Sequence, residues 1–170
     1  MNRHGAPKQP MSHAPQSSEQ DQVVLMDDIP HPDRDTSAPF VLANERLVAI
    51  VYRIAEADFE RFGPFSDDDP FCVVAFMSAA FHQFGPPSDA DLPAYFLASK
   101  GVRGYSAHEV MRSSLVADSW GLEYSLEGGL RHFVLTFGDS TFECVAGDCT
   151  VAGIYGNGDI AAREAFSLCQ

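Results

Sequence analysis

The chain has 170 residues, and its 24 acidic against 11 basic side chains give a formal net charge of -13 at pH 7. Only Lys8 and Lys100 are lysines. Nucleic acids and anionic membrane surfaces are bound through clustered positive charge, so this composition excludes both as expected partners. The apolar share of 45%, with 13 Phe residues, is enough to form the core of one domain.

The first residues lack the apolar stretch of about 7–15 residues that marks a secretory signal, and no window approaches the roughly 18 apolar residues of a membrane-spanning helix. We therefore expect a cytoplasmic protein. Its four cysteines lie among apolar residues, which predicts reduced, partly buried thiols: Cys72, Cys144, Cys149 and Cys169. A cysteine-based zinc site is not expected, because structural zinc sites need a second cysteine pair.

Residues 1–39 are predicted to form a disordered, acidic, proline-rich arm, and residues 40–170 a single domain. The arm contains six of the 11 prolines, together with Gln, Ser, Asp and His, and buries too little to offset its ordering entropy. Its one apolar patch, Val23–Met26, has two interpretations. It is either part of a solvated tail or a short segment that adds a strand to a partner or folds back on the domain.

The expected fold class is α+β, with an antiparallel sheet, a C-terminal β-hairpin or meander and few short helices. Residues 47–52 form a β-branched apolar run that is typical of a strand buried on both faces. Residues 71–84 are equally apolar, and their pattern fits either a strand or a helix. Residues 160–166 are predicted to form a short helix, with Asn157 or Asp159 as its N-cap.

Two Gly-Asp dipeptides, at positions 138–139 and 147–148, separate three alternating runs near the end of the sequence. Such dipeptides suit two-residue hairpin turns, in which Gly takes the positive φ. The segment 130–151 is therefore predicted to form three consecutive antiparallel strands.

Pairing Phe137 with Ser140 and Ala146 with Cys149 separates apolar from polar side chains. The apolar face carries Phe133, Leu135, Phe137, Phe142, Cys144, Ala146, Cys149 and Val151. The polar face carries His132, Thr136, Thr141, Glu143 and Thr150. A slip of one residue would mix Phe with Glu and Thr, so the pattern favours this register.

This register has two chemical consequences. His132 and Glu143 become diagonal neighbours that could share a hydrogen bond. Cys144 and Cys149 become diagonal neighbours with Cβ atoms about 7 Å apart, whereas a disulfide needs roughly 4 Å.

Residues 131–146 read RHFVLTFGDSTFECVA. This string resembles the signature of an uncharacterised family of small bacterial proteins, in which histidine usually stands at the position of Gly138. A second block is similar to the same family, and it consists of Gly85-Pro86-Pro87-Ser88-Asp89, Gly101, Tyr105, Glu109-Val110 and Ser113-Ser114. The two blocks cover about a third of the chain, and the resemblance implies membership without implying an activity.

The chain departs from this family pattern at two further places. The family has His-Pro where this chain has Tyr95-Phe96, and Trp where this chain has Leu115. If those histidines build a site in relatives, that site is incomplete here. The departures therefore favour a binding or structural role.

The residues with chemical potential in the domain are histidines and carboxylates. His82, His108 and His132 lack the His-x-x-x-His spacing that places two ligands on one helical face, so neither a metal nor a cofactor is predicted. There is no Gly-x-Ser-x-Gly elbow, and Ser113-Ser114 is interpreted as a pair of turn hydroxyls. An alternative ligand-binding site would combine His108, Glu109, His132, Asp139 and Glu143.

Two functional hypotheses follow. The first is a non-catalytic binding or accessory protein that acts through a protein partner, which the acidic charge and the arm favour. The alternative is an enzyme or metal-binding protein with a site around His108, Glu109, His132 and Glu143. The two are distinguished by whether these side chains converge in a cleft.

Overall fold

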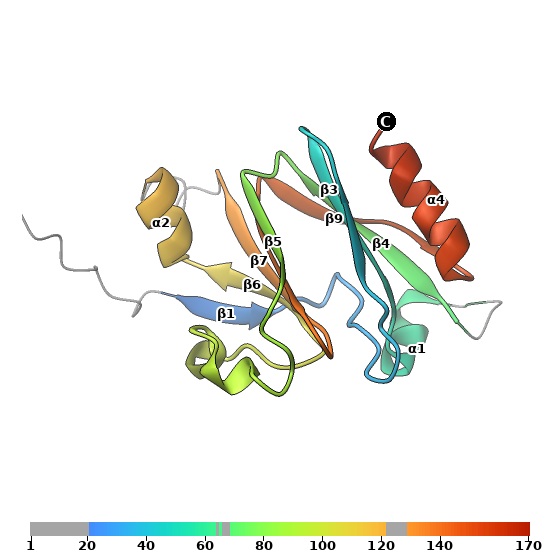
Figure 1. The fold of residues 1–170 in the computed structure, drawn as a ribbon, viewed down its shortest axis with the longest axis horizontal. Helices are drawn as coiled ribbons and strands as arrows, with labels where there is room; N and C mark the ends of the chain where they lie inside the picture. The colour runs from blue at the N-terminus through green and yellow to red at the C-terminus, as the bar shows by residue number, and fades with distance from the viewer. Residues whose placement is uncertain (1–20, 64, 66–68, 122–128) are drawn as a thin grey trace, which may run out of the picture.

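The computed structural model describes residues 21–63, 65, 69–121 and 129–170, and within them the chain forms two antiparallel β-sheets and three α-helices (Figure 1). The first sheet has the spatial order β1 (Gln22–Leu25), β6 (Ala107–Met111), β7 (Arg131–Thr136), β8 (Thr141–Ala146) and β5 (Phe81–Gly85). The second has the order β2 (Phe40–Ala43), β3 (Leu47–Arg53), β4 (Phe71–Met77) and β9 (Asp148–Tyr155). The predicted α+β class is confirmed.

The helical segments are short and lie outside the two sheets (Figure 1). The α-helices are α1 (Phe59–Phe62), α2 (Ser114–Trp120) and α4 (Gly158–Leu168). The 3-10 turns are η1 (Glu56–Asp58), η2 (Leu92–Ala94) and η3 (Ala98–Lys100). No described helix is both long and apolar enough to cross a membrane.

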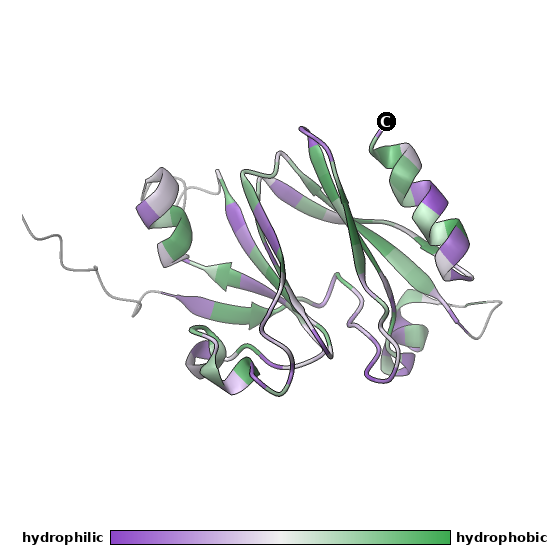
Figure 2. Ribbon diagram, viewed as in Figure 1, coloured by the Kyte–Doolittle hydropathy of each residue, from purple (hydrophilic) through white to green (hydrophobic). Residues whose placement is uncertain are grey.

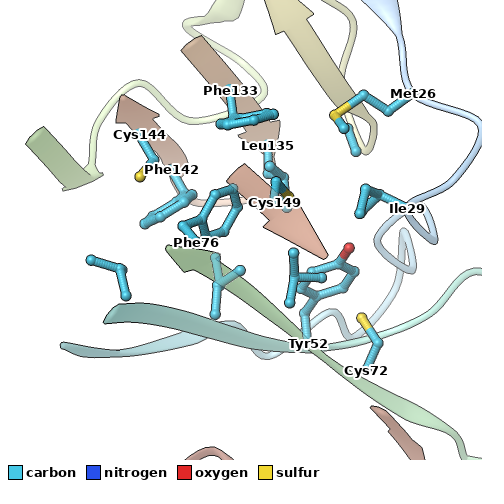
Figure 3. Packing of buried hydrophobic residues seen from close by; sticks show 14 of the residues in the cluster. Met26, Ile29, Tyr52, Cys72, Phe76, Phe133, Leu135, Phe142, Cys144 and Cys149 are labelled. Atoms are coloured by element: carbon cyan, nitrogen blue, oxygen red, sulfur yellow. The ribbon is translucent and has the colours of Figure 1, made fainter. Parts of the chain in front are cut away.

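The main core lies between the inner faces of the two sheets, where the green apolar segments of Figure 2 meet. Phe76 of the second sheet contacts Phe133 and Phe142 of the first, with ring centroids 5.4 Å and 5.2 Å apart (Figure 3). All three side chains are fully buried. A buried Phe contributes roughly 3–5 kcal/mol relative to Ala, so this cluster is a major source of stability.

Each sheet is also covered on its outer face. Ala161 and Ala165 of α4 pack against the second sheet, and the Asn157 side chain caps the helix by accepting a 3.0 Å hydrogen bond from the amide of Ile160. Asn157 is therefore the cap, as one of the two predicted alternatives stated. The outer face of the first sheet is covered by Leu92 and the segment that follows it, in a cluster with Leu97, Val102, Val110 and Val134.

The first predicted turn has the expected two-residue length, but Gly138 does not take the expected positive φ, and the second predicted turn is wrong. The amide of Phe137 donates to the carbonyl of Ser140 at 2.8 Å, which closes a two-residue turn between β7 and β8. The dipeptide at 147–148 does not reverse the chain within the sheet. Instead, it passes the chain to the other sheet, where β9 pairs with β4. Cys149 still faces the core, because side-chain alternation does not depend on which strand is the neighbour.

The strand-or-helix ambiguity at 71–84 is resolved in favour of strands. The segment contains β4, a turn and then β5, so this crossing also transfers the chain from one sheet to the other. Both β3 and β4 are buried on both faces. The sequence of such a strand does not alternate between apolar and polar residues, so it cannot be recognised by that pattern.

The boundary predicted at residue 39 does not match the contacts of residues 21–39. β1 pairs with β6, and Met26 and Ile29 are 5% and 1% exposed within the main core. Asp21 accepts hydrogen bonds from the amide and hydroxyl of Ser114 at 2.6 Å and 2.9 Å. The Val23–Met26 patch therefore folds back on the domain. Residues 1–20, the rest of the expected arm, lie outside the described residues.

These contacts generate a deletion test. Removing residues 1–38 removes β1, Met26 and Ile29 from the structure. We therefore expect the free energy of unfolding to fall by several kcal/mol and the thermal midpoint to fall by more than about 5 °C. Removing residues 1–20 deletes none of these contacts and should shift the midpoint by only a few degrees. Differential scanning calorimetry of both variants measures the difference, and equal midpoints would contradict the assigned packing.

Candidate functional site

The most connected polar cluster lies on the outer face of the first sheet and joins three side chains. His132 on β7 places Nδ1 2.8 Å from the hydroxyl of Ser113. Its Nε2 lies 2.8 Å from Oε1 of Glu143 on β8. The contact between His132 and Glu143 that the hairpin register predicts is confirmed, since these residues are diagonal neighbours across β7 and β8.

The direction of these hydrogen bonds follows from the chemistry of the groups. The hydroxyl of Ser113 caps α2 by accepting from the amide of Val116 at 3.2 Å. When His132 is neutral, the hydroxyl proton points to Nδ1, and Nε2 carries the proton that Glu143 accepts. A serine, a histidine and a carboxylate in one chain of hydrogen bonds is the arrangement that activates a serine nucleophile in hydrolases.

This cluster is, however, closed to solvent. Ser113 is 2% exposed, His132 1% and Glu143 9%. The two open grooves found among the described residues, one beside α4 and one beside η1, are not lined by any of these side chains. In this conformation the cluster satisfies buried polar groups, and the side chain of Ser113 is shielded from solvent.

Tyr95 extends the cluster on the side of Glu143. Its hydroxyl oxygen is buried and lies beside the Glu143 carboxylate. Burial raises the pKa of Tyr95 well above its usual value, and the neighbouring Glu143 carboxylate raises it further. The phenol therefore stays protonated. Tyr95 is also one of the two positions at which the family pattern has the His-Pro pair.

The remaining candidates of the sequence hypothesis do not join this cluster. His108 lies on the same face, but the amide of Arg103 donates to its Nε2 at 3.2 Å, which leaves Nδ1 to donate to the carbonyl of Val134 at 3.3 Å. Both ring nitrogens are thus engaged. Glu109 faces the opposite side of the sheet. There it accepts two hydrogen bonds from Arg131, at 2.9 Å and 2.7 Å.

Asp139 is exposed in the β7–β8 turn, and the exposed His82 lies on β5. Only His132 and Glu143 of the five proposed ligand-binding residues therefore come together. Among the described residues, no group of three or more His, Cys, Asp or Glu side chains is placed to hold a metal ion. The expectation that the protein binds no metal stays a prediction, which elemental analysis of untagged protein tests.

The cysteines are free, and three of them are buried. Burial raises the pKa of Cys72 and Cys144 to about 12. These thiols are protonated at neutral pH and are therefore poor nucleophiles. The expected reduced, partly buried thiols match this arrangement.

Sequence reasoning missed Ser113 and Tyr95 as members of the cluster. Ser113-Ser114 ahead of an apolar run is a recognisable N-cap signal for α2. Its proximity to His132 depends on how α2 packs on β7, and no local pattern encodes that. The polar face was predicted correctly, but Thr136 and Thr141 on it are only 1% and 4% exposed, because the segment from Pro87 to Ser106 covers them.

An open groove lies on the outer face of the second sheet, beside the end of α4. Its volume is about 560 Å³, and its lining includes Leu47, Ala75, Met77, Ala152 and Leu168. Met77 and Leu168 are 45% and 46% exposed. Glu45 and Arg46 form part of the polar rim.

The chain was compared with protein-family models, with curated proteins and with solved structures. No family model, no curated protein and no solved structure matches it. The geometry of the described residues therefore carries the functional argument.

The polar cluster gives a first prediction for this region. Glu143→Ala leaves the buried Nε2–H of His132 without an acceptor, and we expect a loss of about 2–3 kcal/mol in the free energy of unfolding. Glu143→Gln keeps an acceptor and should cost less than about 1.5 kcal/mol. Urea denaturation measures both values. Equal costs for the two variants would contradict a hydrogen bond between these side chains.

His108 gives a pH dependence. Burial lowers its pKa from 6.5 to about 4. The unfolded chain therefore binds a proton at this residue between about pH 6.5 and 4 while the folded protein does not, so stability falls as the pH falls through this window. The lowered pKa of His108 contributes about 3 kcal/mol to the free energy of unfolding above this pH window.

The test compares His108→Gln, which titrates nothing, with His82→Gln at an exposed histidine. Urea denaturation at a series of pH values should show a smaller loss of stability below pH 6.5 for His108→Gln only. The half-buried His31, whose pKa burial also lowers, is present in all three proteins. If the free energy of unfolding of His108→Gln falls with pH as steeply as that of the wild type, His108 is not the titrating group.

Proposed function

We propose that the protein is a small, non-catalytic binding or accessory protein that acts through a protein partner. The proposal rests on one observation: the side chains that could catalyse a reaction are not the ones that solvent and partners can reach. The polar side chains suited to catalysis are buried and bonded to one another, whereas an open, largely apolar groove elsewhere on the molecule has a lining that includes no histidine or cysteine.

The groove has the composition of a protein-binding surface. An apolar floor with a polar rim is typical of such interfaces, because the apolar part supplies affinity and the rim stays hydrated. Met77 and Leu168 project from different elements, a strand and a helix, into the same depression. The net charge of -13 favours a partner with a basic surface.

The test uses two methionines of equal exposure. Met77 in the groove and Met111 on β6 are both 45% exposed. A partner captured from cells and then purified should bind Met77→Glu at least about tenfold more weakly than the wild type, because a charge is buried on docking. Met111→Glu should bind like the wild type. Equal affinity for all three proteins, measured by calorimetry, would show that the groove is not the contact surface.

A second candidate, an enzyme using Ser113 as nucleophile, is favoured by the hydrogen-bond chain through His132 to Glu143. It requires α2 or the segment over the sheet to open. A fluorophosphonate probe labels activated serines covalently, so labelling of the wild type but not of Ser113→Ala would place this candidate first. Absence of labelling supports the binding role.

A further inference from the structure

β5 is an edge strand that contains no charged residue and no proline, and Pro86 and Pro87 follow directly after it. Its five residues, Phe-His-Gln-Phe-Gly, include no Lys, Arg, Asp, Glu or Pro, although the chain as a whole has a net charge of -13. Natural edge strands are normally blunted by charge, proline or a bulge, because their free backbone groups pair with other strands. Phe84 on this edge is 41% exposed. Figure 1 shows β5 in the foreground, with no helix in front of it.

The backbone groups that β5 presents outward follow from the register of the sheet. The turn bond between Phe137 and Ser140 makes these two residues a hydrogen-bonded pair, so the backbone of Thr141, Glu143 and Val145 points to β5. Their partners on β5 are Gly85, Gln83 and Phe81. The N–H and C=O groups of His82 and Phe84 therefore point away from the sheet, and no described residue bonds to them.

We propose that β5 pairs antiparallel with β5 of a second copy of this chain, about a two-fold axis beside Gln83. This register places His82 opposite Phe84 of the second copy as a hydrogen-bonded pair, and the symmetry repeats the pair on the other side of the axis. All outward N–H and C=O groups of both residues are then satisfied. The two five-stranded sheets become one continuous sheet.

The side chains of β5 are complementary in the same register. Phe81 lies opposite Gly85 of the second copy on the outer face, where an aromatic ring covers the bare glycine backbone. Gln83 lies opposite its own copy, and two amides can exchange hydrogen bonds. On the inner face, His82 lies opposite Phe84. The exposed Phe84 ring is thus partly covered.

Charge explains why this strand suits a second copy despite the repulsion between two acidic chains. No formal charge lies on β5 at pH 7, so like charges do not meet at the interface. The remaining carboxylates repel through solvent, and salt screens such repulsion beyond about 10 Å at 0.1 M. The dimer should therefore tighten as the salt concentration rises. A dimer that loosens with salt would be held by ion pairs, which β5 lacks, and would overturn the proposal.

Disulfide trapping tests the register. Only residue 83 meets its own copy across the axis, and antiparallel non-hydrogen-bonded pairs, with Cα atoms about 4.5 Å apart, fall within disulfide range. In a Cys169→Ser background, Gln83→Cys should form a disulfide-linked dimer under mild oxidation. The matched control His82→Cys should not, because its own copy is displaced diagonally. Efficient trapping through His82→Cys, or none through Gln83→Cys, would overturn the register.

Sedimentation equilibrium tests the interface without a crosslink. The wild-type chain of 18.5 kDa should sediment at up to twice that mass as its concentration rises. His82→Pro removes an outward N–H while leaving the bonds to β8, and should weaken the dimer about tenfold or more. Phe84→Lys should also weaken the dimer, whereas Phe166→Lys on α4, at a phenylalanine that is 57% exposed, should not.

Circular dichroism confirms that each variant is folded before its mass is interpreted. A wild type that stays at 18.5 kDa up to about 0.5 mM would overturn the proposal. A dimer that survives both β5 substitutions, or that Phe166→Lys disrupts equally, would also overturn it, because the interface would then lie elsewhere.

Discussion

The outer face of the first sheet is covered, and this constraint governs the polar chemistry of the molecule. Five polar side chains project from the sheet into a layer from which water is excluded: His108, His132, Thr136, Thr141 and Glu143. A buried polar group without a partner costs about 1–3 kcal/mol, so each of these needs a partner within the protein. The serine cap of α2, the carbonyls of the covering segment and the neighbouring strands supply those partners. The cluster that resembles a catalytic arrangement thereby also anchors α2 to the sheet, and the two threonines anchor the covering segment.

The same constraint separates what the sequence could predict from what it could not. Alternation is a local property, so the β7–β8 hairpin, its turn and the contact between His132 and Glu143 follow from residues close together in the chain. The burial of Thr136 and Thr141 depends on a segment that folds over the sheet from about 30–50 residues away, and polarity alone suggested exposure.

The interpretation of the N-terminal region failed for a related physical reason. Its prolines and polar residues have the composition of a solvated arm, yet five apolar positions among them are enough to add a strand and two core side chains. Similarly, the dipeptide at 147–148 has the composition of a turn. Such a composition predicts that the chain changes direction, but it does not predict which strand the next strand pairs with. The pairing of β9 with β4 is a property of the two-sheet packing.

The pairing of β1 with β6 also affects how the chain is made. β1 ends at Leu25, but its hydrogen-bonding partner begins only at Ala107. Ribosomes add roughly 5–20 residues per second, so the first strand emerges several seconds before any partner exists for it. During that interval Met26 and Ile29, which later become core residues, are exposed to the cellular environment. The N-terminal strand is consequently added to its sheet only after more than half of the chain has been synthesised.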